Sequence, residues 1–331
     1  MTYDICMNSQ LVSNDYDITT YKPMNHVNAC ICMIDIVNFS KWCNNKQPEH
    51  IFQTMTSYNT FLNDLISRYS DVDKIELVGD SVLIMAGFRD EYGVCERVSN
   101  TVKLAMAILS RLDYIRSIFD ENTSLRIGIH VGDIYSGFIE SPRKFQLFGN
   151  SINVSSRLEQ SSLPGTFTIS KLAYDLYLEN PKSISHHFEC GNIITSYFKG
   201  VGKLDCVVGY VRQNKILIAD DDHWALSILN RISKIRYNLD SVMTYTIEDA
   251  ILNMKRCVYE ICIIDVHFVN ATAFGGLRDF REWEKIHRRY KQKVIIASQT
   301  INEDIVQVYS DLADGFINKT DIFNLKQYLE I

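Results

Sequence analysis

Residues 74–88, KIELVGDSVLIMAGF, are the stretch that most constrains how this chain folds. Two apolar runs flank the dipeptide Gly79-Asp80, which predicts a tight β-hairpin with an acid at its tip. Asp35 follows another apolar run and is expected at a strand end of the same sheet. Two such carboxylates suit Mg²⁺ or Mn²⁺ bound with a polyphosphate, because these ions prefer oxygen ligands. Either acid alone is more simply an ordinary turn or strand-end residue.

Length and composition indicate a globular protein of two domains. The chain has 331 residues, of which 46% are hydrophobic and 22% charged, and a single ordinary domain rarely reaches that length. The formal net charge of −6 argues against a broad nucleic-acid or anionic-membrane surface, since both need an excess of basic residues. We therefore expect no nucleic-acid partner.

The expected location is the cytoplasm. No apolar run approaches the roughly 20 residues of a membrane span. The N-terminal residues lack the basic region and apolar core of a signal peptide. The nine Cys are scattered and form no CxxC pair, which favours free thiols in a reducing compartment.

The first half of the chain predicts a ferredoxin-like α+β domain over residues 27–212, after an N-terminal arm of residues 1–26. The order β-α-β-β-α-β is typical of an antiparallel sheet with helices on one face. Gly132-Asp133 predicts a second hairpin turn inside the apolar stretch 125–139. The expected strands are 27–35, 74–88 as a hairpin, 125–139, 166–170 and 197–211, and the expected helices are 51–69, 94–112 and one near Asn153.

The second half, residues 215–331, predicts a different architecture. Apolar strands at 215–219, 259–265, 293–298 and 315–318 alternate with single helical stretches. This alternation is typical of a doubly wound, flavodoxin-like α/β domain with a parallel sheet. The boundary is expected at residues 212–214, without a long linker.

Several polar residues of the first half are not explained by the fold pattern. Asn153 and Arg157 are four residues apart on one predicted helix and share a face, so both can face a phosphoryl oxygen that gains negative charge. Lys199, in the glycine-flanked sequence FKGVGK, is placed to reach a terminal phosphate.

These residues carry a resemblance to the class III nucleotidyl cyclases. DIVNFS at Asp35, VGD at Asp80, LRIGIHVGD, LFGNSINVSSRLE and FKGVGK follow that family's order and approximate spacing over residues 27–211. The resemblance implies a lyase that converts a nucleoside triphosphate into a 3′,5′-cyclic nucleotide. The alternative is a non-catalytic nucleotide-binding module on the same fold.

The resemblance also implies a homodimer with two active sites at its interface, each using two divalent cations, Mn²⁺ or Mg²⁺. One chain is expected to contact the metals, and the other to bind the nucleotide. The expected metal contacts are Asp35, Ile36 and Asp80, and the partner chain is expected to supply the catalytic pair Asn153 and Arg157 and the substrate-binding residues Lys199, Glu76 and Gln146.

Glu76 and Gln146 occupy the family's base-reading positions. A carboxylate facing the ring acceptor of adenine is unfavourable, whereas guanine, uracil and cytosine all offer an edge that Glu76 and Gln146 can bind. Two long side chains narrow the pocket, which favours a pyrimidine. The chain therefore resembles the pyrimidine cyclases of Pycsar anti-phage systems, whose cyclic UMP or cyclic CMP activates a separate effector. A guanylate cyclase of ordinary signalling is the alternative.

The second half resembles a response-regulator receiver. The resemblance implies Mg²⁺ binding by Asp220 and Asp221 and phosphorylation of Asp265. Two features depart from the pattern: Thr320 replaces the usual Pro, and the loop after Asp265 is longer than usual. The expected phosphate contacts are Ser298 and Lys319. Arg143 and Lys144 precede the base-reading strand but differ in register from the family's phosphate-binding Arg, so they receive no role.

Overall fold

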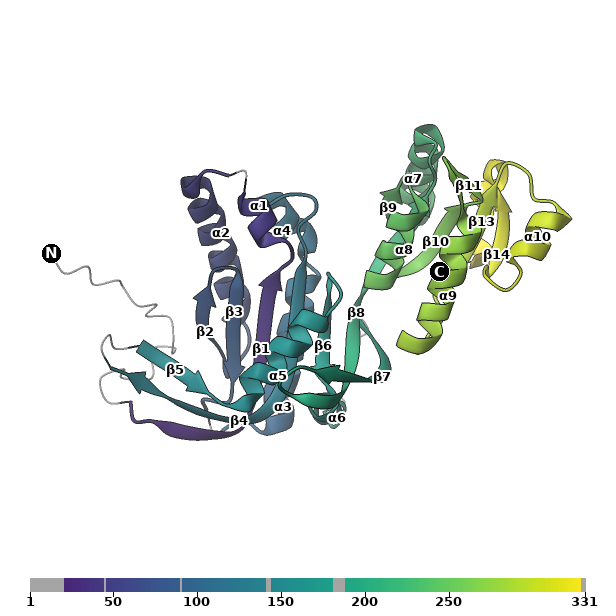
Figure 1. Cartoon of the computed structure of the whole chain (residues 1–331). Coiled ribbons are helices and arrows are strands. Elements are labelled where there is room, and N and C mark those ends of the chain that lie inside the picture. Colours follow the sequence, from purple (N-terminus) through teal and green to yellow (C-terminus); the bar gives the residue numbers. More distant parts are fainter. Residues whose placement is uncertain (1–20, 45, 90, 141–143, 181–187, 329–331) are drawn as a thin grey trace. The chain divides into compact units, whose positions relative to one another are not determined.

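The computed structural model divides into two compact units (Figure 1). The first combines Met1–Ser185 with Ile193–Gly209, and the second combines His186–Asn192 with Tyr210–Ile331. The residues that the structure describes are 21–44, 46–89, 91–140, 144–180 and 188–328.

The first unit is built on a mixed sheet in the order β8-β6-β4-β1-β3-β2. The inner order β4-β1-β3-β2 is antiparallel and ferredoxin-like, as predicted. β6 departs from the prediction because it pairs parallel to β4, while β5 pairs with β4 and β7 with β8. The strands are β1 (Met24–Ile36), β2 (Val72–Val78), β3 (Ser81–Ala86), β4 (Leu125–Ile139), β5 (Lys144–Phe148), β6 (Thr166–Ser170), β7 (Phe188–Phe198) and β8 (Gly202–Ala219).

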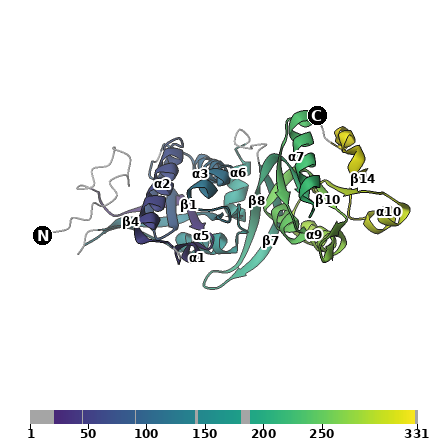
Figure 2. The same ribbon diagram turned by 90° about the horizontal axis from the view of Figure 1, so that it is seen from above.

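The helices cover both faces of this sheet, so the prediction of one covered face is wrong. Figure 2 shows α2, α3 and α6 on one side of β1 and α5 on the other. The reason is visible in β1, where consecutive residues 29–32 are all buried and therefore need cover on both sides. The helices are α1 (Phe39–Cys43), α2 (Pro48–Ile66), α3 (Val94–Leu109), α4 (Leu112–Ile118), α5 (Asn150–Ser161) and α6 (Lys171–Leu178).

The two Gly-Asp dipeptides adopt different conformations. Gly79 has φ 61° and closes the β2–β3 hairpin, which confirms the predicted turn. Gly132 instead lies inside the continuous strand β4, where it pairs with Ala29 of β1, so the second predicted turn is wrong. A Cβ on Gly132 would lie 2.3 Å from Ser151 Oγ, and glycine here allows α5 to approach the sheet.

β1 begins before the predicted position. Residues 1–20 of the predicted arm lie outside the described residues. The last residues of that arm belong to β1, because Met24 pairs with Ser136 of β4 and a bulge follows between His26 and Ala29. Tyr21 also contacts the sheet, and its ring packs edge-on against Phe145.

The second unit contains the predicted doubly wound sheet. Its strands run parallel in the order β9-β8-β10-β13-β14, which is the flavodoxin-like order 2-1-3-4-5 counted from β8. β8 is one continuous strand through residues 212–214, where the boundary was expected. The remaining strands are β9 (Asp240–Thr244), β10 (Cys257–Asp265), β11 (His267–Phe268), β12 (Ala271–Thr272), β13 (Val294–Ser298) and β14 (Gly315–Asn318).

Helices pack on both faces of this parallel sheet. One apolar core joins the sheet to α8 and α9, and a second joins it to α7 and the 3₁₀ segment η2. β9 and α8 lie within a stretch that the sequence pattern assigned to a single helix, because β9 is short and only partly buried. The helices are α7 (His223–Tyr237), α8 (Ile247–Arg256), α9 (Ala273–His287), α10 (Glu303–Tyr309) and η2 (Lys319–Tyr328).

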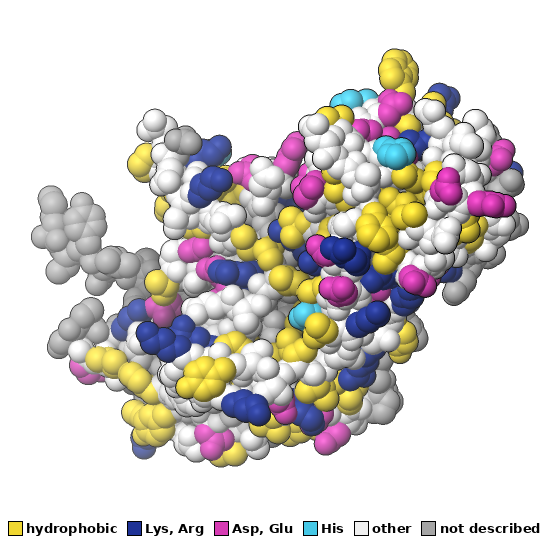
Figure 3. All heavy atoms as spheres, turned by 45° about the vertical axis from the view of Figure 1, so that its right-hand side comes forward, with side chains coloured by type: hydrophobic (Ala, Val, Ile, Leu, Met, Phe, Trp, Pro, Cys, Tyr) yellow, Lys and Arg dark blue, Asp and Glu magenta, His cyan; other side chains and the backbone are white. Residues whose placement is uncertain are grey.

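Two surface properties bear on function. On the face drawn in Figure 3, acidic and basic side chains are interspersed, so that face carries no extended basic surface. Among the described residues, every helix is too short or too polar to span a bilayer.

Candidate active site

Two acids meet at one end of the first unit's sheet. Asp35 lies at the end of β1, and Asp80 lies in the turn between β2 and β3. The pKa of Asp80 is raised to about 6, mainly by burial and also by the neighbouring Asp35 carboxylate. Ser81 Oγ donates a hydrogen bond to Asp35 Oδ1 at 3.1 Å. Two adjacent carboxylates repel each other, and a cation bound between them relieves that repulsion. The pair therefore suits a hard divalent ion.

Ile36 follows Asp35 as the last residue of β1. Its side chain is buried, with 2% of its surface exposed. Only its main chain is therefore available to a metal ion, as a carbonyl oxygen.

Sequence reasoning missed a pair formed by the half-buried Arg126 and the buried Glu159, which contacts Asp35. Arg126 Nη2 lies 2.6 Å from Asp35 Oδ2, and Arg126 Nε lies 3.0 Å from Glu159 Oε1. The pKa of Glu159 is raised to about 7, mainly by burial and also by the Asp35 carboxylate, while Arg126 opposes the rise. The structure brings Arg126 to Asp35 through the strand register, because the two residues pair across β1 and β4.

α5 carries the predicted catalytic residues on its outer side. Asn153 is exposed and Arg157 is half-buried, whereas Glu159 faces inward and is buried. Arg157 Nη1 donates to Gln160 Oε1 at 2.8 Å. Among the described residues, no hydrogen bond or ion pair joins Asn153 or Arg157 to Asp35 or Asp80.

Lys199 lies in the turn between β7 and β8. Gly200 and Gly202 have φ 83° and 95°, so the predicted glycine-dependent turn is present. The Lys199 side chain is exposed. It is accessible to a ligand from outside this chain.

Glu76 and Gln146 come from strands β2 and β5. Lys144 Nζ forms an ion pair with Glu76 Oε1. The sequence pattern assigned no role to Lys144. Gln146 is two residues further along β5 and so extends from the same side of the strand as Lys144. The three polar side chains therefore belong to one surface of the unit.

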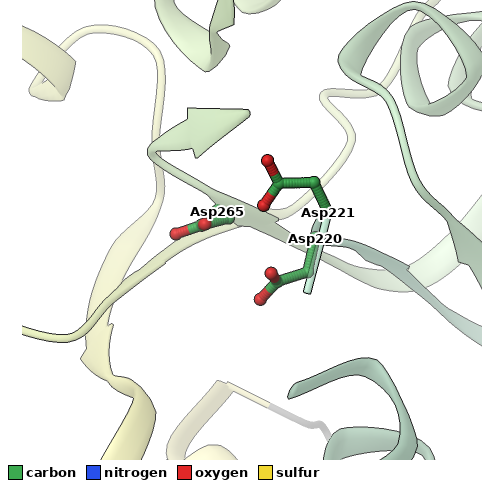
Figure 4. Close-up of side chains that lie close together, drawn as sticks. All are labelled: Asp220, Asp221 and Asp265. Atoms are coloured by element: carbon green, nitrogen blue, oxygen red, sulfur yellow. The ribbon is translucent and has the colours of Figure 1, made fainter. Parts of the chain in front are cut away.

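The second unit holds three acids at the ends of its central strands, as Figure 4 shows. Carboxylate oxygens of Asp220, Asp221 and Asp265 lie within 4.8 Å of one another. Lys319 Nζ lies 2.7 Å from Asp220 Oδ2 and 3.0 Å from Asp265 Oδ2. Burial raises the pKa of Asp265. Ser298 is buried at the end of β13, the strand beside β10.

A main-chain contact also reaches this acid cluster. The loop after Asp265 contains the short pair β11–β12, and the N–H of Val269 donates to Asp221 Oδ2 at 2.5 Å. The cluster, with oxygen ligands only, is of a kind that binds Mg²⁺.

The fold and the acid pair define the first unit as a ferredoxin-like α+β domain with two adjacent carboxylates at one end of its sheet. The family model described as "Adenylate and Guanylate cyclase catalytic domain" matches residues 21–208. The chain therefore belongs to this family. The predicted enzyme class, a phosphorus–oxygen lyase, is confirmed for this catalytic domain.

Curated relatives share this domain at low identity. The germination-specific adenylate cyclase of Dictyostelium discoideum is 28% identical over 159 residues, which are 46% of this chain and 18% of that protein. The receptor-type guanylate cyclase gcy-23 of Caenorhabditis elegans is 30% identical over 151 residues, or 44% of this chain and 14% of that protein. The chain thus spans less than a fifth of the length of these relatives.

Solved structures support the fold. The guanylate cyclase domain of RhGC from Catenaria anguillulae, solved with GTP, gives a TM-score of 0.51 at 21% identity and covers 57% of this chain and 98% of its own. The adenylyl cyclase CyaB from P. aeruginosa gives a TM-score of 0.51 at 18% identity and covers 57% of this chain and 96% of its own. At these identities the likeness concerns the fold alone.

Proposed function

We propose that the chain converts a nucleoside triphosphate into a 3′,5′-cyclic nucleotide and pyrophosphate. The observation that carries the proposal is the adjacent pair Asp35 and Asp80 in a domain of the cyclase family. These carboxylates and the Ile36 carbonyl hold two divalent ions, Mn²⁺ or Mg²⁺. When bound, the ions supply Lewis-acid polarisation of the ribose 3′-hydroxyl and of the phosphate oxygens.

The chain's own residues bind and orient the nucleotide. Arg157 and Asn153 donate to the α-phosphate oxygen, where charge increases as the 3′-oxygen bonds to phosphorus and the bond to pyrophosphate breaks. Lys199 binds the terminal phosphate. Because no hydrogen bond or ion pair of the described residues joins Asn153 or Arg157 to the acids of their own chain, a homodimer assembles each site from the acids of one chain and the catalytic pair of its partner.

The substrate we propose is a pyrimidine nucleotide, UTP or CTP. Glu76 accepts an N–H of the base and Gln146 donates to a neighbouring acceptor, and two long side chains leave little room for a purine. A guanylate cyclase is the second candidate, since gcy-23 and the RhGC domain are named as guanylate cyclases.

We further propose that the cyclic pyrimidine nucleotide acts as a second messenger in the cytoplasm during anti-phage defence and activates a separate effector. This part of the proposal is supported by the resemblance to the Pycsar cyclases in domain organisation and in the base-reading pair.

For the second unit we propose a receiver-like role in which Asp220 and Asp221 bind Mg²⁺ and Asp265 accepts a phosphoryl group. The support is the oxygen cluster and the position of Lys319 between Asp220 and Asp265. Ser298 is the expected phosphate contact. The departures at Thr320 and in the loop after Asp265 are compatible with a binding role without phosphorylation.

The experiment that tests the cyclase is a comparison of ATP, GTP, UTP and CTP with the purified protein and Mn²⁺, with products identified by mass. We expect cyclic UMP or cyclic CMP as the main product, and we expect Asp35→Ala to abolish it. Cyclic GMP as the main product selects the guanylate alternative. Nucleotide binding without turnover, unchanged in Arg157→Ala, identifies a binding module.

A further inference from the structure

The second unit has a basic pocket at the end of α9. The pocket has a volume of about 360 Å³, which is large enough for a small ligand. Three acidic residues line it, against six basic ones: Arg278, Arg281, Lys285, Arg288, Arg289 and Lys291. Asp314 forms ion pairs with Arg281 and Lys291, and even with this acid counted the basic residues exceed the acidic ones by two. The pocket is thus locally positive in a chain whose net charge is −6.

Arg281 fixes the shape of the pocket. Its side chain is 5% exposed. Its guanidinium donates to the main-chain oxygens of Leu312 at 2.9 Å and Gln292 at 2.8 Å, and it pairs with Glu284 at 2.7 Å. These contacts join α9 to the segments before β13 and β14, so the pocket is formed before any ligand binds.

Arg288 is a buried cation without a carboxylate partner among the described residues. Its side chain is 6% exposed, and its Nη2 donates to the main-chain oxygens of Met254 and Cys257. Its guanidinium lies 4.6 Å from the centre of the Tyr210 ring. Within the described ranges, Arg288 Nε has no hydrogen-bond partner. Buried charges are normally paired, and carbonyls and a ring compensate only part of this one, so its positive charge still attracts an anion.

Lys285 and Arg289 are the exposed cations beside it. Among the described residues, no hydrogen bond or ion pair engages Lys285 Nζ. Basic residues in the last turn of a helix often serve its free carbonyls. Here Asn192 Nδ2 donates to the main-chain oxygens of Lys285, Ile286 and Arg288, at 3.3, 3.0 and 3.0 Å. The end of α9 therefore has its own donor, and Lys285 is available to a ligand.

We propose that this pocket binds a small ligand carrying two or more phosphate charges. Guanidinium and ammonium groups are the side chains that bind phosphate oxygens, and the excess of two positive charges favours a multiply charged ligand over one with a single charge. Two sources share this chemistry, a free inorganic polyphosphate and the phosphate chain of a nucleotide, whose base could stack on the exposed Tyr290. The proposal does not depend on the cyclase assignment, because the second unit alone forms the pocket.

The test is calorimetric titration of the full chain with inorganic triphosphate, UTP and cyclic UMP. The protein carries Arg157→Ala and Lys199→Ala, so that the proposed cyclase contacts do not contribute, and EDTA removes divalent ions. We expect triphosphate and UTP to bind and cyclic UMP, with one negative charge, to bind much more weakly. Lys285→Glu should weaken triphosphate binding about tenfold, because it reverses a charge at the pocket.

The matched control is Lys234→Glu. Lys234 is 72% exposed on α7, which packs on the other face of the parallel sheet from α9. The same charge reversal there should weaken triphosphate binding by about twofold or less, since salt screens distant exposed charges.

The titrations also identify the source of the ligand. UTP binding more tightly than triphosphate assigns the pocket to a nucleotide, and equal affinities assign it to the polyphosphate chain alone. Three results overturn the inference: no binding of either anion, equal weakening by Lys285→Glu and Lys234→Glu, or cyclic UMP binding as tightly as triphosphate. None of them affects the proposed cyclase, which is tested by its products.

Discussion

At the scale of single residues, the acid pair cannot be separated from the Arg126–Glu159 pair beside it. Glu159 is buried, and its pKa is raised from the ordinary value of 4.5 to about 7. The folded state thus binds a proton more tightly than the unfolded state, so the stability of the metal-free protein falls as pH rises from about 4.5 to about 7. We expect Glu159→Gln to remove this loss and to stabilise the metal-free protein at pH 8 by on the order of 2 kcal/mol.

The same substitution should weaken Mn²⁺ binding several-fold, because it removes negative charge and leaves Arg126 paired with Asp35 alone. Unfolding at pH 5 and pH 8 and titration of free Mn²⁺ by electron paramagnetic resonance measure the two effects. If Glu159→Gln and the wild type differ in free energy of unfolding by the same amount at pH 5 and pH 8, Glu159 does not titrate in this range.

At the scale of elements, the close approach of α5 to β4 positions the proposed catalytic pair. A Cβ on Gly128 would lie 2.1 Å from Ser155 O and 2.3 Å from Glu159 N, both backbone atoms of α5. We expect Gly128→Ala to push α5 outward, to destabilise the first unit by about 1–3 kcal/mol and to lower cyclase activity more than tenfold. Denaturant unfolding and initial rates measure these effects.

Gly275→Ala is the matched control for that prediction. Gly275 lies in α9, and a Cβ there meets no atom within 4 Å. Alanine favours a helix over glycine by about 0.5–1 kcal/mol, so this variant should be slightly more stable than the wild type and equally active. If Gly128→Ala and the wild type have the same free energy of unfolding, α5 shifts to accommodate the added methyl group without loss of stability.

Much of the fold follows from local patterns, and the exceptions have a common physical cause. The same dipeptide is a turn at Gly79-Asp80 and extended strand at Gly132-Asp133. What distinguishes them is not local, because α5 packs against Gly132 whereas no atom lies near a Cβ of Gly79. Tertiary packing therefore decides between two conformations that the dipeptide permits equally.

The candidate site was predictable where residues lie beside a turn or strand end. Asp35 and Asp80 could be predicted in this way, and their proximity follows from the pairing of β1 with β3. Arg126, Glu159 and Lys144 could not, because their roles depend on which distant strand or helix they meet. Arg126 is 91 residues from Asp35, and Lys144 is 68 from Glu76. Sequence spacing carries no information on such contacts.

The acid cluster of the second unit makes a further prediction at the scale of elements. Lys319 follows β14 and its Nζ neutralises acids at the ends of β8 and β10. We expect Lys319→Met to destabilise the second unit by ~2 kcal/mol without Mg²⁺, because the carboxylates of Asp220 and Asp265 lose their counter-charge. Added Mg²⁺ should restore more stability to this variant than to the wild type.

Calorimetry with and without Mg²⁺ measures the effect. The comparison is made in an Asp35→Ala background, so that ions at the cyclase acids do not contribute. An equal Mg²⁺ response in both proteins would argue that the cluster does not bind the ion.

At the scale of the whole molecule, the arrangement of α5 predicts that one chain alone has no complete site. Its acids Asp35 and Asp80 are neighbours, while no hydrogen bond or ion pair of the described residues joins Asn153 or Arg157 to either acid. If two chains share each site, Asp35→Ala and Arg157→Ala should each be inactive as homodimers. Mixed dimers should contain one site in which both the acids and the arginine are intact.

The expected activity of an equal mixture follows from symmetry. Random exchange makes half of the dimers mixed, and each mixed dimer has one intact site of two, so the mixture should reach about a quarter of wild-type activity. The two variants are mixed after each is shown to be folded and inactive, and pyrophosphate release is followed over time.

Mixing Asp35→Ala with Asp80→Ala is the control, because both substitutions remove acids from the same side and leave at most one metal acid per site. Recovery in the first mixture and not in the second requires sites shared between chains. Equal inactivity of both mixtures, with mixed dimers demonstrated by native mass spectrometry, would mean that each chain brings its own acids and arginine together by a rearrangement of α5.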